Sequence, residues 1–140
     1  MLKGVPKIIS PVLLKILSEM GHGDEIVIAD GNFPSENYGK RVVRADGLSG
    51  KAMLDAVATL IPLDSYAEFN FILMATGEGE PTPPIWSEYR KIAKAKEENV
   101  RELQMERTAF YERAKNAFAV IATGEEAIYA NVILKKGVIQ

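Results

Sequence analysis

Five short segments of the chain are dense in apolar residues, a pattern typical of β-strands. The clearest contains Ile26-Val27-Ile28, which is apolar on both faces, as in a strand covered on both sides of its sheet. Asp30 ends this run, and a Gly-Asn pair and Phe33-Pro34 follow it. We predict strands over residues 25–30, 41–45, 70–76, 117–123 and 131–135.

Helical spacing of apolar residues fills most of the chain between these strands. The first helix begins at Ser10-Pro11, where serine is the N-cap and proline takes the first helical position. Gly21 is predicted to end it in a left-handed conformation. Its apolar face would comprise Val12, Leu13, Ile16, Leu17 and Met20. We predict three further helices over residues 50–61, 84–95 and 108–116.

The remaining segments lack a regular apolar pattern. Residues 34–40 are predicted to form a loop, and so are residues 77–84, which hold two glycines and three prolines. Residues 94–107 are densely charged and are predicted to be a solvated helix extension followed by a connector. Strands that alternate with helices predict one α/β domain over residues 1–140, with helices on both faces of the sheet. The pattern does not determine the strand order.

Composition narrows the function. The chain has 140 residues, a net charge of −2 and no basic stripe with interleaved aromatic residues, which argues against a nucleic-acid partner. It has no cysteine, no apolar run of membrane-spanning length and no signal-peptide pattern, so we expect a cytoplasmic protein without a membrane partner. A single histidine makes a histidine-based zinc site improbable. No glycine-rich phosphate-binding loop follows any strand.

His22 is the first candidate for chemistry. It is the only histidine, and two glycines flank it, which leaves room for a ligand around the imidazole. A histidine ordinarily titrates near pH ~6.5, so it transfers protons in both directions near neutrality. A histidine at a helix C-terminus also interacts favourably with the helix dipole without any other role. The sequence alone leaves both interpretations open.

Four other polar residues are weaker candidates. Asp30 caps a turn, accepts hydrogen bonds from a polyhydroxyl ligand, or orients His22. Arg107 lies among many charges and stays protonated, so any role in a site is hydrogen bonding and not proton removal. Tyr129 and Asn131 flank Ala130 at the start of the last strand, where alternation would aim both side chains to one side.

Eight short motifs occur in order along the chain: Met20-Gly-His-Gly-Asp-Glu-Ile, Asn32-Phe-Pro, Arg44-Ala-Asp-Gly-Leu, Leu63-Asp-Ser-Tyr, Phe110-Tyr-Glu-Arg-Ala, Ala117-Phe-Ala-Val, Thr123-Gly-Glu and Leu134-Lys-Lys-Gly-Val. Together they resemble the ribose pyranase/fucose mutarotase (RbsD/FucU) family over residues 2–138. Glu106-Arg107, followed by Ala109-Phe-Tyr-Glu-Arg, favours the fucose branch of that family.

The resemblance implies a three-layer α/β/α domain and an isomerase that needs no cofactor or metal. Such an enzyme interconverts the α and β anomers of a free monosaccharide, L-fucose in the first place and ribose more weakly. His22 matches the family's acid/base histidine, and Asp30 and Arg107 match substrate-binding positions. Tyr129, Ala130 and Asn131 match a sugar-contacting Tyr-Gly-Asn segment. The family forms homo-oligomeric rings, decamers or related assemblies, whose subunits share sites.

Two departures from the family pattern keep alternatives open. Ala130 replaces the glycine of Tyr-Gly-Asn, and Gly31-Asn32 replaces the Ala-His of some bacterial members. One alternative is therefore a non-catalytic sugar-binding or assembly protein on the same fold. In another, the ring itself is the function.

Overall fold

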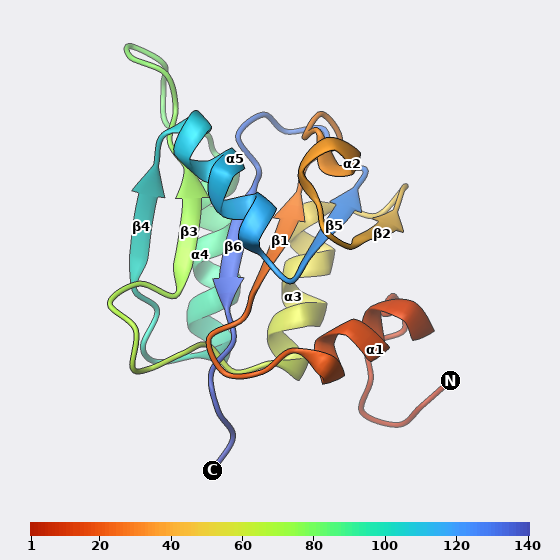
Figure 1. The fold of residues 1–140 in the computed structure, drawn as a ribbon. Helices are drawn as coiled ribbons and strands as arrows, with labels where there is room; N and C mark the ends of the chain where they lie inside the picture. The colour runs from red at the N-terminus through yellow and green to blue at the C-terminus, as the bar shows by residue number, and fades with distance from the viewer.

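Six strands form one sheet in the order β2-β5-β1-β6-β3-β4 (Figure 1). The computed structural model describes residues 1–140. The strands are β1 (Glu25–Ala29), β2 (Val42–Ala45), β3 (Phe71–Met74), β4 (Glu102–Met105), β5 (Ala119–Thr123) and β6 (Val132–Lys135). The helices are α1 (Pro11–Glu19), α2 (Ser35–Tyr38), α3 (Gly50–Leu60), α4 (Ile85–Lys96) and α5 (Arg107–Asn116).

The direction of β6 decides which loops meet. β1 pairs in parallel with β5, as β2 does with β5 and β3 with β4, whereas β6 runs antiparallel to both of its neighbours, β1 and β3. Val132 at the start of β6 lies opposite Ile28 of β1 and Leu73 of β3. The segment before β6 therefore lies beside the residues that follow β1 and β3.

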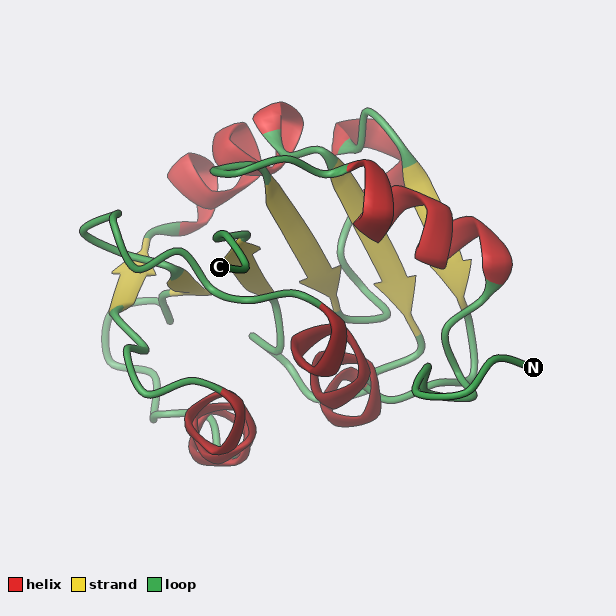
Figure 2. Cartoon of the chain, turned by 90° about the horizontal axis from the view of Figure 1, so that it is seen from below, coloured by secondary structure: helices red, strands yellow, loops and turns green.

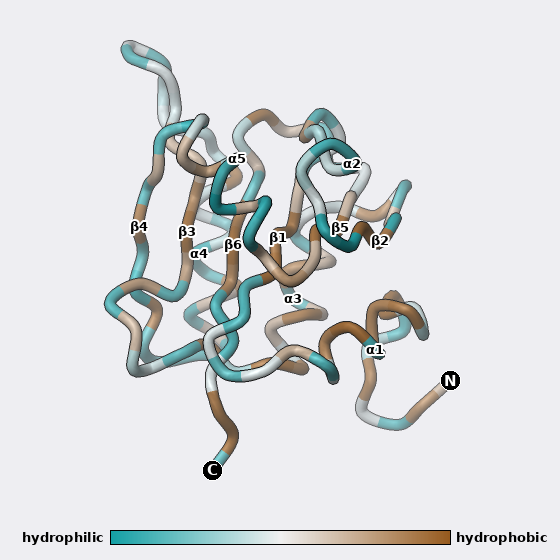
Figure 3. Tube along the Cα trace, in the orientation of Figure 1, coloured by the Kyte–Doolittle hydropathy of each residue, from teal (hydrophilic) through white to brown (hydrophobic).

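Helices cover both faces of this sheet. Figure 2, which views the molecule from below, shows α3 and α4 on one side of the strands and α5 and α2 on the other. Alternate residues of β1 serve the two cores: Ile26 and Ile28 belong to one apolar cluster, and Val27 and Ala29 belong to the other. Figure 3 shows β1, β3 and β6 largely in brown, the hydrophobic end of its scale. The predicted three-layer α/β/α architecture is confirmed.

The first helix forms as predicted but ends differently. Ser10 is its N-cap, and its hydroxyl accepts a hydrogen bond of 3.1 Å from the Leu13 amide. The prediction for Val12 was wrong, since this residue is 58% exposed. Gly21 is not left-handed either; the helix ends at Met20 in an extended conformation, and the positive φ of 87° occurs at Gly23.

Lys136 explains why this helix needs no left-handed glycine at its end. The Lys136 ammonium donates hydrogen bonds of 2.8 Å to the Leu17 carbonyl and 2.6 Å to the Met20 carbonyl. A cation at a helix C-terminus satisfies free carbonyls and complements the dipole. A residue that is 116 positions away in sequence from Met20 thus supplies the cap.

Two charged or polar segments contain structure that their composition did not predict. Residues 34–40 hold the single turn of α2, and residues 94–107 hold β4. β4 is the edge strand next to β3; its Gln104 is exposed and its other three residues are partly buried. Its Glu102 pairs with Arg90 of α4 at 2.7 Å, and its Leu103 and Met105 pack against the core on the α5 side. An edge strand needs no continuous apolar run, which is why the pattern missed it.

Candidate functional site

Asp30 and Asn131 form a reciprocal hydrogen-bonded pair where β1 ends and β6 begins. The Asp30 amide donates to the Asn131 side-chain oxygen at 2.7 Å, and the Asn131 amide nitrogen donates to the Asp30 carboxylate at 3.1 Å. Both residues are buried, with 6% and 4% exposure. Each side chain therefore fixes the orientation of the other, although 101 positions separate them in sequence.

The Asp30 carboxyl lies in an environment that disfavours its charge. Burial raises the pKa of Asp30, and hydrogen bonds from the backbone amides of Asn32 and Ala130 and from the Asn131 side chain only partly oppose this rise. A desolvated carboxylate is a strong hydrogen-bond acceptor for a ligand hydroxyl. Within one subunit, His22 bonds Asp64 and not Asp30, so Asp30 does not orient the histidine of its own subunit.

Tyr129 adopts an unusual backbone conformation beside this pair. Its φ is 54°, which makes it the only non-glycine residue with a positive φ in the chain. A left-handed conformation of this kind costs about 1–2 kcal/mol for a residue with a Cβ. The Tyr129 hydroxyl donates to the Glu80 carboxylate at 2.7 Å and accepts from the Gly77 amide at 3.3 Å. The bond to Glu80 is the main cause of the raised pKa of Tyr129.

A hollow of about 340 Å³ opens above these residues. This volume lies in the range of sites for small molecules. Arg107, the exposed first residue of α5, reaches the same hollow from the end of β4. The lining residues are Asp30, Asn32, Phe33, Met74, Glu80, Arg107, Tyr111, Ile128, Tyr129 and Asn131. Ala130 lies beneath the hollow, fully buried in the core.

His22 lies at the opposite edge of the sheet, before β1 begins. Its Nε2 is 3.0 Å from the Asp64 carboxylate, and the Tyr66 ring centroid is 5.6 Å from the imidazole centroid. Asp64 is 4% exposed, whereas the His22 side chain is 46% exposed. Burial would raise the pKa of Asp64, but hydrogen bonds from the Tyr66 amide and from His22 hold it below its ordinary value.

The end of β6 holds this histidine in place. The Gly23 amide donates to the Lys136 carbonyl at 2.8 Å, and the Asp64 amide donates to the Lys135 carbonyl at 2.9 Å. A Cβ at Gly137 would come within 2.6 Å of the Leu63 carbonyl, so only glycine lets the chain pass this close. The same strand thus fixes Asn131 at its first end and the His22–Asp64 pair at its second.

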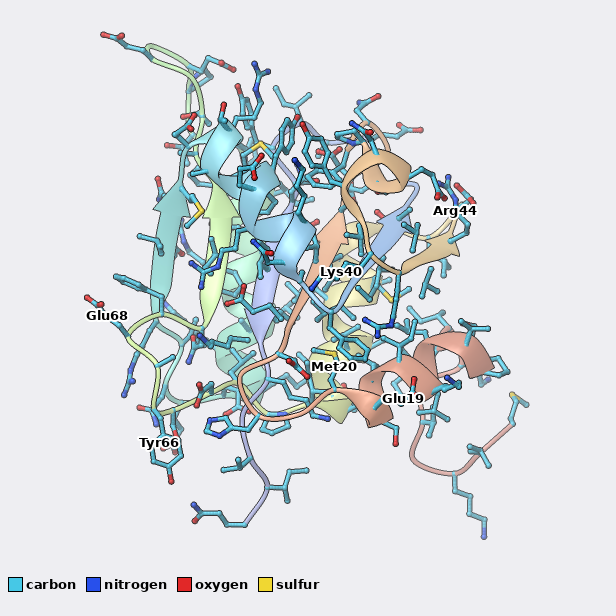
Figure 4. All side chains as sticks on the ribbon, viewed as in Figure 1. Glu19, Met20, Lys40, Arg44, Tyr66 and Glu68 are labelled. Atoms are coloured by element: carbon cyan, nitrogen blue, oxygen red, sulfur yellow. The ribbon has the colours of Figure 1, made fainter.

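One subunit does not bring His22 to the hollow. Between them lies β1, whose five residues span about 17 Å. Tyr66, the neighbour of His22, lies at the lower edge in Figure 4, whereas the segment around residues 77–84, which lines the hollow through Glu80, rises from the upper edge in Figure 1. The structure therefore groups Asp30, Arg107, Tyr129 and Asn131 and leaves His22 exposed elsewhere.

The model of the RbsD / FucU transport protein family matches residues 3–139. This chain belongs to the RbsD/FucU family. It is 49% identical to the L-fucose mutarotase of Histophilus somni (strain 129Pt) over 140 residues, which cover 99% of this chain and 97% of that protein.

Two solved RbsD/FucU structures superpose closely. The fucose mutarotase of Streptococcus pneumoniae, in complex with L-fucose, has a TM-score of 0.96 and 46% identity, and the match covers 99% of this chain and 100% of that one. FucU of Bifidobacterium longum has a TM-score of 0.95 and 52% identity, with coverage of 99% and 100%. The family resemblance inferred from the motifs is confirmed.

Sequence reasoning missed several residues of this RbsD/FucU site. Asp64 and Tyr66 belong to the motif Leu63-Asp-Ser-Tyr, yet nothing local connects that motif with His22, 42 positions earlier. Tyr111 belongs to the motif Phe110-Tyr-Glu-Arg-Ala, but nothing in that motif assigned it to the site, and Glu80 carried no signal beyond a polar side chain. The structure contains no group of three or more His, Asp or Glu residues arranged to hold a metal ion. None of its helices has the length and apolar character needed to cross a membrane.

Proposed function

We propose that this protein is a mutarotase that interconverts the α and β anomers of L-fucose. The observation that carries the proposal is the hollow with its locked Asp30–Asn131 pair, in a chain nearly half identical to a named L-fucose mutarotase. Carboxylate, amide, guanidinium and phenol groups are suited to a sugar, because each satisfies hydroxyl groups in a fixed direction.

The reaction needs two proton transfers and no net redox change. One group removes the proton of the anomeric hydroxyl while another protonates the ring oxygen, so the C1–ring-oxygen bond breaks and an open aldehyde forms. Rotation about C1–C2 turns the other carbonyl face to the ring hydroxyl, and the transfers run in reverse. His22 is our candidate for the acid/base group, held by Asp64. Asp30, Arg107, Tyr129 and Asn131, with Ala130 beneath them, would bind the sugar.

A second copy of the chain would complete this site. His22 is exposed at one edge of the sheet and the hollow opens at the other, so a head-to-tail contact would bring one subunit's imidazole to the next subunit's sugar. Exposed apolar side chains lie at both places, Tyr66 beside His22 at 68% exposure and Ile128 on the hollow at 64%. A closed ring of such contacts, a decamer or a related assembly, is therefore part of the proposal.

The test is anomer exchange measured by NMR. Saturation transfer between the two anomeric protons of L-fucose should accelerate in proportion to protein concentration, and a run on D-ribose would measure the weaker pyranase activity. Light scattering on the same sample gives the assembly size. If the protein does not accelerate exchange at any concentration, the proposed mutarotase activity is excluded.

The same samples test the non-catalytic alternative. The separation of His22 from the hollow within one subunit is the observation that favours it. Titration calorimetry that detects L-fucose binding, without faster exchange, would support a sugar-binding protein. We also place the enzyme in the cytoplasm, because a chain without cysteine suits a reducing compartment; fractionation of cells that express it checks this location.

A further inference from the structure

Two side chains of helix α4 hydrogen-bond to the proposed sugar-binding segment, Tyr129 to Asn131. The indole nitrogen of Trp86 donates to the Tyr129 carbonyl at 2.9 Å, and the Tyr89 hydroxyl donates to the Ala130 carbonyl at 3.0 Å. Trp86 is 3% exposed and Tyr89 is fully buried. Two successive carbonyls of the binding segment are therefore held by side chains one helical turn apart.

These two bonds act on the strained residue of the site. Tyr129 has a φ of 54°, a conformation that an unrestrained tyrosine would leave. With its carbonyl and the next one fixed, the peptide units on its C-terminal side cannot rotate, and its side chain stays directed at the hollow. The same restraint sets Asn131, whose amide must meet Asp30.

The surroundings of Tyr89 suit a permanent donor. Burial raises the pKa of Tyr89, and the carboxylates of Glu125 and Asp30 raise it further, so the hydroxyl keeps its proton. Gly50, the first residue of α3, makes room for this hydroxyl, because a Cβ there would overlap the Tyr89 oxygen. Helix α4, the start of α3 and the segment before β6 together fix the position of the Tyr89 hydroxyl.

We propose that Trp86 and Tyr89 are positioning residues that hold Tyr129 and Asn131 in their sugar-binding conformation. The inference rests on the proposed function only in taking L-fucose as the ligand. Neither residue lines the hollow. Their effect is therefore expected in sugar affinity and in the backbone of Tyr129, and not in proton transfer.

The variants Trp86→Phe and Tyr89→Phe each remove one donor and keep an aromatic ring. We expect the L-fucose Kd and KM to rise about three- to tenfold for each, the range for one lost neutral hydrogen bond, with kcat within about twofold of wild type. Ala93→Gly is the control. Ala93 is a buried residue of α4, and glycine in its place weakens the helix without removing a side-chain donor. Its KM should stay unchanged.

A crystal structure of each variant supplies a readout independent of activity. The φ of Tyr129 should leave the left-handed region in Trp86→Phe. In a Tyr129→Gly background, where that conformation costs little, Trp86→Phe should add no further loss of affinity. Should Trp86→Phe fold poorly, the KM of Tyr89→Phe compared with that of Ala93→Gly still decides the matter.

Three results would overturn the inference: a Tyr129 φ that remains near its original value with unchanged KM, an equal rise in KM for Ala93→Gly, or additive losses in the Tyr129→Gly background. Failure of the proposed function looks different, since wild type itself would then neither bind nor interconvert L-fucose. In that case the φ of Tyr129 in the variants decides the positioning role alone.

Discussion

The groups of residues at the two ends of β1 differ in how completely a single subunit encloses them. At the carboxyl end, Asp30 and Asn131 are buried and hydrogen-bonded to each other, and the hollow above them is formed within the subunit. At the amino end, His22 has one buried partner, Asp64, and an open side facing solvent. Binding and chemistry are thus assigned to opposite edges of one sheet, and mutations at the two edges should fail in different ways.

The largest effect is expected from His22→Ala. If this imidazole transfers the protons, L-fucose exchange should fall about 10²-fold or more, because general acid/base catalysis contributes that much. The Kd for L-fucose should stay within about threefold of wild type, since the hollow is untouched. NMR exchange and calorimetry measure the two quantities. Glu19→Ala is the matched control, because Glu19 is exposed and its side chain pairs only with Lys15. Near-normal exchange in His22→Ala would contradict the assignment.

Co-assembly of His22→Ala with Asp30→Asn tests whether the histidine of one subunit reaches the hollow of the next. Asp30→Asn should raise KM about tenfold or more, because a charged hydrogen-bond acceptor is lost. Co-expressed with His22→Ala, it should regain activity: random assembly of a ring leaves about one quarter of the shared sites intact. Exchange assays on the purified mixed oligomers, against each variant alone, measure this. Mixed oligomers no more active than their parents would place the whole site in one subunit.

A smaller effect is expected from Asp64→Asn, which keeps the shape but removes the charge beside His22. The imidazole would lose its orienting carboxylate, and kcat should fall about tenfold while KM holds. Saturation kinetics by NMR separate the two constants. A change in KM alone would mean that Asp64 shapes the binding surface and not the acid/base group.

The same variant has a defined signature in acid. The pKa of Asp64 is below its ordinary 3.8 in the folded protein, so its charge stabilises the fold above that value. This contribution is lost as pH falls below about 4 through the lowered pKa. Asp64→Asn should therefore be less stable at neutral pH, and its disadvantage should shrink in acid. Urea unfolding of both proteins at several pH values tests this prediction.

The smallest effect is a pH dependence of binding at the other edge. The pKa of Asp30 is above its ordinary 3.8, so its carboxylate takes up a proton at a higher pH than an exposed aspartate. A protonated Asp30 accepts hydroxyl groups less well, and the L-fucose Kd should rise several-fold as pH falls through this raised pKa. Calorimetry between about pH 4 and pH 7 measures it. Asp30→Asn should show a flat profile.

Local sequence patterns predicted most of the helices and strands, but not how α1 ends and not the edge strand β4. Ser10 starts α1, and the apolar runs around Ile26 and Ile72 form central strands, because burial on both faces requires apolar residues at successive positions. The end of α1 depends on Lys136 from the far end of the chain, and β4 forms by pairing with β3, with only Leu103 and Met105 packed against the core. Neither cause is visible in a short window of sequence.

Sequence by itself identified the α/β architecture, the family motifs and the six candidate residues, since each depends on residue type and near spacing. Tertiary structure alone paired Asp30 with Asn131 across 101 positions and His22 with Asp64 across 42. Both pairings follow from the antiparallel β6, whose place in the sheet is set by long-range contacts that no periodicity encodes. The same strand, running from Asn131 to the Lys136 carbonyl, is also what keeps the proposed sugar-binding residues and the histidine at opposite edges.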